Sequence, residues 1–250
     1  MRRAFAILLV MMLAAAAWTQ TSSTTQAAPA AKPSTAAKPA GTAASAAIKP
    51  TAIIKTTVGN LTCTLFPDKA PIGVANFIGL ASGTKDWKNP VSGATKHGVP
   101  LYDGTIFHRV IPDFMIQGGD PAGNGAGDPG FKFKNETSPD LQFDRAGRLA
   151  YANAGPGTNG SQFFITEAPQ MYLNGGYTIF GQCDDAALEL VKQIARMATD
   201  PATDHKPLRP VKILHISIVR GTGATPKPGA GTTVKKPAAA TAPKAPASSN

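Results

Sequence analysis

The most informative part of the sequence is residues 107–120, which read Phe107-His108-Arg109-Val110-Ile111-Pro112-Asp113-Phe114-Met115-Ile116-Gln117-Gly118-Gly119-Asp120. This stretch places one guanidinium beside aromatic and aliphatic side chains and a single uncharged amide. A second run, residues 151–165, again combines aromatic rings with amides and contains no carboxylate. Together the two runs predict a site that grips an apolar group and directs one permanent cation at it.

Short apolar runs on either side of this stretch predict further strands. Residues 52–58 and 61–66 are expected to form a hairpin with its turn at Gly59-Asn60, because Gly tolerates the positive φ that tight turns need. The other strands are expected near residues 105–111, 114–117, 130–133, 148–152, 162–166, 178–183 and 211–219.

Two segments have the pattern of amphipathic helices. Pro71–Ser82 begins with Pro and is followed by Gly83, and residues 185–198 follow an acidic cap at Asp184 or Asp185. Residues 85–104 are expected to form a long polar loop. Many short strands with only two helices predict a mainly β fold, a closed barrel or a sandwich, since a parallel sheet would need a helix between most strands.

The two ends of the chain differ in composition from its middle. Residues 1–50 and 221–250 contain no Asp, Glu or Tyr and are rich in Ala, Pro, Thr and Lys. We therefore expect residues 21–50 and 221–250 to be disordered, because such segments bury too little apolar surface to offset chain entropy. These segments are either solvated spacers or bind weakly, through their lysines, to an anionic envelope surface. Residues 51–220 are left as one folded domain.

The first twenty residues predict a secretory signal peptide. Arg2 and Arg3 precede an apolar core that begins at Ala4, and small residues from Ala14 to Ala17 suit cleavage. The apolar part is shorter than the roughly 20 residues that span a bilayer. We expect an exported protein without stable membrane insertion after cleavage, most simply periplasmic; secretion, envelope association or an uncleaved anchor are the alternatives.

Export also bears on the cysteines, because exported proteins fold in an oxidising compartment. Cys63 and Cys183 both fall in expected strands. The simpler interpretation is two buried thiols that act as small apolar side chains, and the alternative is a disulfide that closes a long loop.

The net charge of +10 does not indicate a nucleic-acid-binding domain. Nine of the 25 basic residues lie in residues 1–50 and 221–250, whereas all 15 acidic residues lie in 51–220. The domain is therefore close to neutral, and a nucleic-acid-binding face would concentrate positive charge. No nucleic-acid partner is expected.

Other chemistries fit the sequence poorly. The four histidines lack the spacing of metal ligands, so no metal site is expected. His108 is a weak candidate for a general base, because alternation along a strand would turn it away from whatever Arg109 contacts. Ser161 lacks the second Gly of a nucleophile elbow, and Gly123–Gly127 lacks the helix and Lys of a phosphate loop.

Residues 107–120, with Ala152-Asn153-Ala154-Gly155-Pro156 and Asn159-Gly160-Ser161-Gln162-Phe163-Phe164, closely resemble cyclophilins. Residues 65–71, 75–77 and 180–181 agree in the same order, so that the resemblance covers nearly all of 52–219. It implies a closed eight-stranded antiparallel β-barrel capped by two α-helices. It also implies peptidyl-prolyl cis–trans isomerase activity on proline-containing polypeptides, with no cofactor.

The resemblance also implies roles for particular residues. The family's essential arginine falls on Arg109, with Phe114 and Gln117 as its catalytic neighbours. The residues expected to bind substrate are Met115, Gly125, Ala152, Asn153, Ala154, Gln162, Phe164, Tyr172, Leu173 and Tyr177. Tyr172 replaces a Trp and Tyr177 a His of the best-known eukaryotic pattern, and Tyr177 matches a bacterial, exported subtype.

These residues suit a reaction that only twists a bond, because rotation about X–Pro needs no nucleophile, base or metal. We expect a monomer that assists the folding of exported proteins. A binding module that holds proline-containing segments without turnover is the main competing interpretation, and a third assigns the tails a tethering role.

Overall fold

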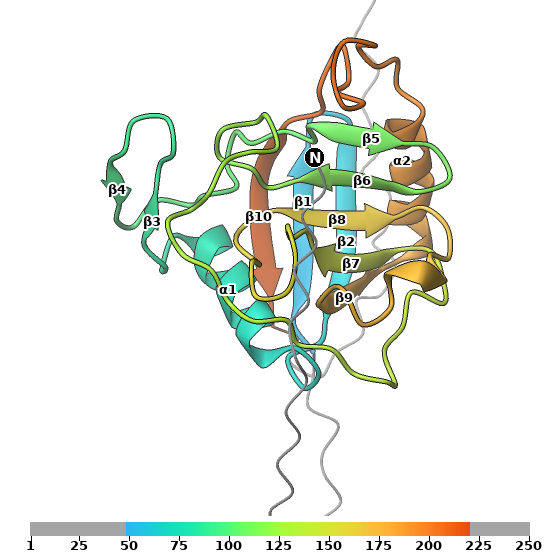
Figure 1. Cartoon of the computed structure of the whole chain (residues 1–250), viewed down its shortest axis with the longest axis horizontal. Helices are drawn as coiled ribbons and strands as arrows, with labels where there is room; N and C mark the ends of the chain where they lie inside the picture. The colour runs from blue at the N-terminus through green and yellow to red at the C-terminus, as the bar shows by residue number, and fades with distance from the viewer. Residues whose placement is uncertain (1–48, 221–250) are drawn as a thin grey trace, which may run out of the picture. The chain divides into compact units, whose positions relative to one another are not determined.

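The computed structural model describes residues 49–220, which form a mainly β domain (Figure 1). The predicted signal peptide, the linker that follows it and the C-terminal tail lie outside the described residues. Within 49–220 the helical elements are α1 (Pro71–Ser82), the 3-10 turn η1 (Met171–Leu173) and α2 (Asp185–Ala195). The strands are β1 (Thr51–Thr56), β2 (Gly59–Leu65), β3 (Trp87–Lys88), β4 (Thr95–Lys96), β5 (Arg109–Ile111), β6 (Met115–Gly118), β7 (Arg148–Tyr151), β8 (Phe163–Thr166), β9 (Ile179–Cys183) and β10 (Ile213–Val219).

The main sheet has eight antiparallel strands in the order β10-β1-β2-β9-β7-β8-β6-β5, as expected. The expected closure of the barrel is only partial, because β10 and β5 form no continuous ladder. Their edges meet just before β5, where Phe107 N–H donates to the Val211 carbonyl at 3.0 Å and Ile213 N–H donates to the Thr105 carbonyl at 2.8 Å. Such bonds protect both edges without a full strand pairing.

Side chains alternate between the two faces of the sheet, so an apolar cluster forms on each face. Val110, Ile116, Ile165 and Leu149 form one row across β5, β6, β8 and β7 and point into the barrel core. The neighbouring rows point to the opposite face, where they join a smaller apolar cluster with Phe143, Leu173 and Ile179. The barrel core therefore stabilises the fold, whereas the second cluster forms the floor of a surface site.

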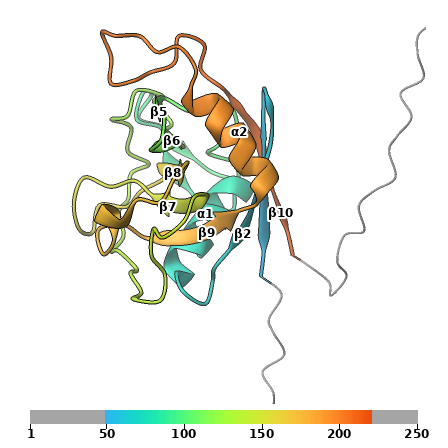
Figure 2. The same cartoon turned by 90° about the vertical axis from the view of Figure 1, so that its right-hand side faces the viewer.

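The two helices lie at opposite ends of the barrel (Figures 1 and 2), and both contribute buried side chains to the barrel core. The Asp184 carboxylate caps α2 by accepting from Ala187 N–H at 2.8 Å, as expected. The start of α1 has a more distant partner, because the Glu136 carboxylate accepts from the N–H groups of Ile72 and Gly73. A segment 64 residues away thus satisfies donors that no neighbouring side chain caps. No helix within residues 49–220 has the length and apolarity needed to cross a bilayer.

Three local expectations were wrong. The first hairpin exists, but its turn is Thr57-Val58, because Thr56 pairs with Gly59. The Thr56 hydroxyl donates to the Gly59 carbonyl and accepts from Val58 N–H. Residues 130–133 are not a strand, and only Phe133 forms a bridge, to Asn159. Residues 85–104 are not a plain loop, because β3 and β4 form a small hairpin that projects from the body (Figure 1).

Cys63 and Cys183 form a disulfide, so the simpler interpretation of two buried thiols was wrong. The two residues face each other where β2 pairs with β9, although 120 residues separate them in sequence. The sequence could not decide between the alternatives, because this strand pairing depends on the whole topology.

Replacing Cys63 and Cys183 together with Ala should lower the free energy of unfolding by roughly 2–5 kcal/mol, because a cross-link over a long loop restricts the unfolded chain. Urea unfolding of wild type and double variant measures the difference. Reductant should destabilise wild type and leave the variant unaffected. Equal unfolding midpoints for the two proteins would contradict this expectation.

Candidate active site

The register of three strands builds the centre of the site. Arg109 on β5 pairs with Gln117 on β6, and Gln117 pairs in turn with Phe164 on β8. Residues paired across a sheet project from the same face, so a guanidinium, an amide and an aromatic ring stand in one row. Met115 belongs to the same face two residues before Gln117, and it is 1% exposed.

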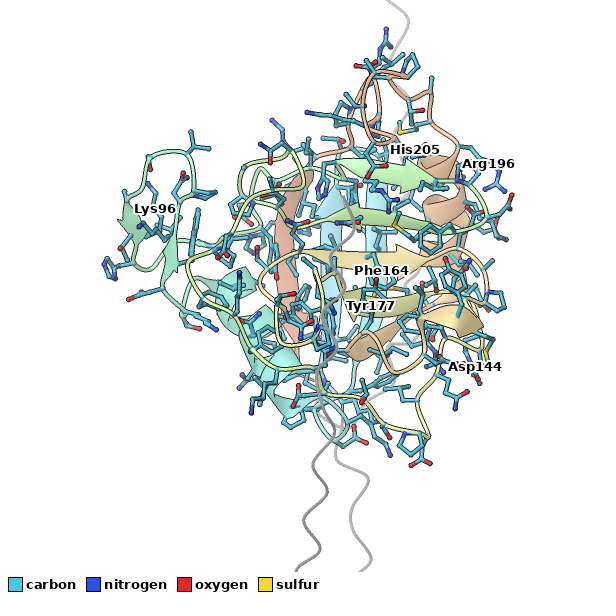
Figure 3. The ribbon with its side chains drawn as sticks, viewed as in Figure 1. Lys96, Asp144, Phe164, Tyr177, Arg196 and His205 are labelled. Carbon is cyan, nitrogen blue, oxygen red and sulfur yellow. A yellow bond between two sulfur atoms is a disulfide. The ribbon has the colours of Figure 1, made fainter. Side chains whose placement is uncertain are left out.

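An apolar floor lies beside this row. The Phe164 ring stacks on Phe143 with centroids 5.8 Å apart and meets Tyr177 edge-on at 5.6 Å. Figure 3 shows Phe164 and Tyr177 close together on this face of the sheet. Phe143 is fully buried beneath Phe164, and sequence reasoning missed it because it lies in an irregular segment. Stacked rings fix the shape of such a floor.

Amide hydrogen bonds order the polar side of the site. Gln117 Nε2 donates to Gln162 Oε1 at 3.0 Å, and Gln162 Nε2 donates to the carbonyls of Gly125 and Gly127 at 3.0 and 3.2 Å. The buried Asp120 carboxylate holds the same glycine loop by accepting from three N–H groups, one of them that of Gly125. The network gives Gln117 a defined orientation toward the groove.

Asn153 holds the loop that follows β7. Its Nδ2 donates to the Gly176 carbonyl at 3.0 Å, and its Oδ1 accepts from Gly155 N–H at 3.1 Å. Ala154 N–H donates to the Thr158 hydroxyl at 2.8 Å. The side chain of Asn153 is therefore engaged within the protein, which leaves its backbone as the part that can meet a ligand.

These elements enclose a groove of about 440 Å³. Ten of the expected site residues line it: Arg109, Phe114, Met115, Gln117, Gly125, Ala152, Asn153, Phe164, Leu173 and Tyr177. Ala154 and Gln162 line an adjoining hollow of about 300 Å³ that shares Gln117 and Gly125 with the groove. Tyr172 lies outside both linings; its ring is 72% exposed and 6.1 Å from that of Phe114.

Further residues line the groove that were not expected there, namely His108, Asn124, Thr203, Asp204 and Lys206. The expectation that His108 turns away from the Arg109 site was wrong. Regular alternation starts only at Arg109, where β5 begins, so that Phe107 enters the barrel core while His108 and Arg109 both border the groove. The other four come from loops, for which strand periodicity carries no signal.

His108 is a buried neutral ring rather than a proton donor. It is 5% exposed, and neither ring nitrogen has a hydrogen-bond partner among residues 49–220. Burial lowers the pKa of His108 below its ordinary value; the nearby Asp120 carboxylate opposes this, whereas Lys206 and Arg109 add to it. The ring therefore stays uncharged near neutral pH.

An NMR titration of the His108 ring should give a pKa below the ordinary 6.5. As pH falls below about 6.5, the unfolded chain then binds a proton that the folded chain does not, so the folded state loses stability. His108→Gln should remove this part of the pH dependence of unfolding. A ring that titrates at 6.5 or above would contradict the assignment.

Within residues 49–220, no cluster of three or more His, Cys, Asp or Glu side chains has the geometry to hold a metal ion. The groove offers the guanidinium of Arg109, several amides and an apolar floor, and the charged side chains of Asp204 and Lys206 also line it.

Comparison with known proteins agrees with this geometry. The family described as cyclophilin type peptidyl-prolyl cis-trans isomerase/CLD matches residues 51–218. The chain belongs to the cyclophilin-type peptidyl-prolyl cis–trans isomerases. It is accordingly an enzyme, an isomerase that acts on proline-containing peptides.

Bacterial members of the family are similar over most of their length. Peptidyl-prolyl cis-trans isomerase B of Streptomyces anulatus is 52% identical over 160 residues, which cover 64% of this chain and 90% of the relative. Peptidyl-prolyl cis-trans isomerase A of Mycobacterium tuberculosis is 51% identical over 164 residues, which cover 65% and 88%.

Solved cyclophilins share the fold. A crystal structure of a Cryptosporidium parvum cyclophilin type isomerase is 36% identical, with a TM-score of 0.57, and covers 69% of this chain and 98% of its own. A second structure of that protein, in the presence of the dipeptide Ala-Pro, has a TM-score of 0.56 at the same identity and covers 68% and 99%.

Proposed function

We propose that this cyclophilin accelerates rotation of X–Pro bonds in exported proteins and that Arg109 stabilises the twisted transition state. Amide resonance sets a rotation barrier of about 18–20 kcal/mol, and uncatalysed X–Pro exchange takes tens to hundreds of seconds. In the twisted state the prolyl nitrogen regains its lone pair. A donor directed at that nitrogen favours the twisted state over both planar states, which is the condition for catalysis.

The observation that carries the proposal is the row Arg109–Gln117–Phe164, in which a cation stands at the edge of an apolar floor. The guanidinium stays protonated at physiological pH. Low polarity around it strengthens its interaction with a developing lone pair. A barrier lowered by roughly 5–7 kcal/mol would correspond to about 10⁴–10⁵-fold acceleration.

The remaining groove residues are proposed to hold the substrate while one side of the bond turns. Phe114, Met115, Phe164 and Leu173 would enclose the pyrrolidine ring, as apolar and aromatic walls do in small-ligand pockets. Gln117, oriented by Gln162, and the backbone of Asn153 would bind the peptide on either side.

Arg109→Ala should lower isomerase activity by more than tenfold and leave the fold intact, because the side chain lies at the surface of the groove and outside the barrel core. Exchange spectroscopy on an Ala-Pro peptide measures the rate, and thermal unfolding serves as the control. Near-normal turnover in a folded variant would refute the mechanism.

Turnover should vary little between about pH 6 and 8, because the proposed mechanism transfers no proton. A bell-shaped profile of kcat/KM in this range would point instead to an acid or base in the reaction. His108→Gln would then identify whether that group is His108.

Export is supported by two features. Residues 1–20 have the composition of a signal peptide, and the disulfide between Cys63 and Cys183 suits an oxidising compartment. Mass spectrometry of the protein from cell fractions should find a mature N-terminus beyond Ala14 in the periplasmic or secreted fraction. An intact Met1 in the cytoplasmic fraction would contradict export.

A further inference from the structure

The loop between α2 and β10 brings a carboxylate to the groove. Thr199 and Pro207 form a bridge across its base, and Asp200 N–H donates to the Lys206 carbonyl at 2.9 Å. The Thr203 hydroxyl donates to the Asp200 carbonyl and accepts from Lys206 N–H. These bonds within the loop make it an ordered element that can place a side chain reproducibly.

One hydrogen bond fixes this loop to the strand that carries Arg109. Val110 N–H donates to the His205 carbonyl at 3.1 Å, and Figure 3 shows His205 close to β5. His205 has a positive φ of 55°, a conformation that residues other than Gly adopt uncommonly. Because Asp204 precedes His205 and Arg109 precedes Val110, this bond holds Asp204 next to Arg109.

The contact between the two side chains is an ion pair. Asp204 Oδ2 lies 2.8 Å from Arg109 Nε, with the arginine side chain 28% exposed and the aspartate 73% exposed. Nε itself is buried and makes no aligned hydrogen bond with any group in the described part of the chain, so the attraction to Asp204 is one of charge. Within residues 49–220, Asp204 is the carboxylate at ion-pair distance from Arg109.

We propose that Asp204 is the positioning residue for Arg109: it holds the Nε side of the guanidinium and leaves the two terminal nitrogens for the substrate. The proposal rests on the catalytic role of Arg109 proposed above. Asp204 and Arg109 both line the groove, and Gln117, which stands opposite Arg109, donates to Gln162 instead. The carboxylate is therefore the group that restrains the guanidinium before a peptide binds.

The expected effect is on rate rather than on stability. An exposed ion pair contributes little to folding, because solvent screens it. An arginine side chain that is already restrained nevertheless loses less conformational entropy on reaching the transition state. This saving can raise the rate by up to about a factor of ten. Lys206, the other charged side chain of this loop at the groove, carries the same sign as Arg109 and cannot replace Asp204.

A double-mutant cycle on the full-length protein tests the proposal, with bound-state exchange of an Ala-Pro peptide as the readout. Asp204→Asn keeps the size of the side chain and removes its charge. It should lower kcat about three- to tenfold and leave KM within about twofold. In an Arg109→Ala background the same substitution should change kcat by less than about 1.5-fold. Asp204→Glu should recover part of the loss.

Asp68→Asn is the matched control, because it removes an exposed carboxylate that pairs with Lys49 away from the groove. It should leave kcat at the wild-type value. Unchanged or raised kcat in Asp204→Asn, or an equal loss in both backgrounds, would overturn the positioning role. Normal activity of Arg109→Ala alone would instead refute the proposed role of Arg109, so the two failures are distinguishable.

Discussion

The register that pairs β5 with β6 and β6 with β8 is the constraint on which the site depends. It aligns Arg109, Gln117 and Phe164 in one row and directs the next row, with Val110 and Ile116, into the barrel core. A slip of one residue would exchange the two faces, burying the guanidinium and exposing the core. The same pairing that stabilises the barrel therefore determines the chemistry of its surface.

The groove suits a reaction in which no bond breaks. Its floor is built from stacked rings, its polar groups are amides held by other amides, and the cation at its edge contacts the exposed carboxylate of Asp204. On the mechanism proposed above, the apolar floor holds the proline ring and the fixed donor favours the twisted amide over the planar one. Thr203, Asp204 and Lys206 of the α2–β10 loop line the same groove.

Much of the fold followed from local sequence. Pro71 and Gly83 delimit α1 as expected, and short alternating runs gave most strands of the sheet. Family resemblance supplied Phe164, Leu173 and Tyr177 of the floor, but not the buried Phe143 on which Phe164 stacks. Contacts between distant segments were not predictable. The disulfide needed the β2–β9 pairing, and the approach of Asp204 to Arg109 needed an irregular loop that hydrogen-bonds to β5. The alternation rule failed at His108, because it holds only within a regular ladder.

We propose that Arg109 acts on the twisted state of the X–Pro bond and contributes little to binding the planar states. NMR exchange on a saturating Ala-Pro peptide separates these two effects, because it yields the dissociation constant and the cis–trans rate of the bound peptide together. For Arg109→Ala, we expect a bound-state rate that falls by more than tenfold while the dissociation constant stays within about threefold. A weakened affinity with an unchanged bound-state rate would contradict it.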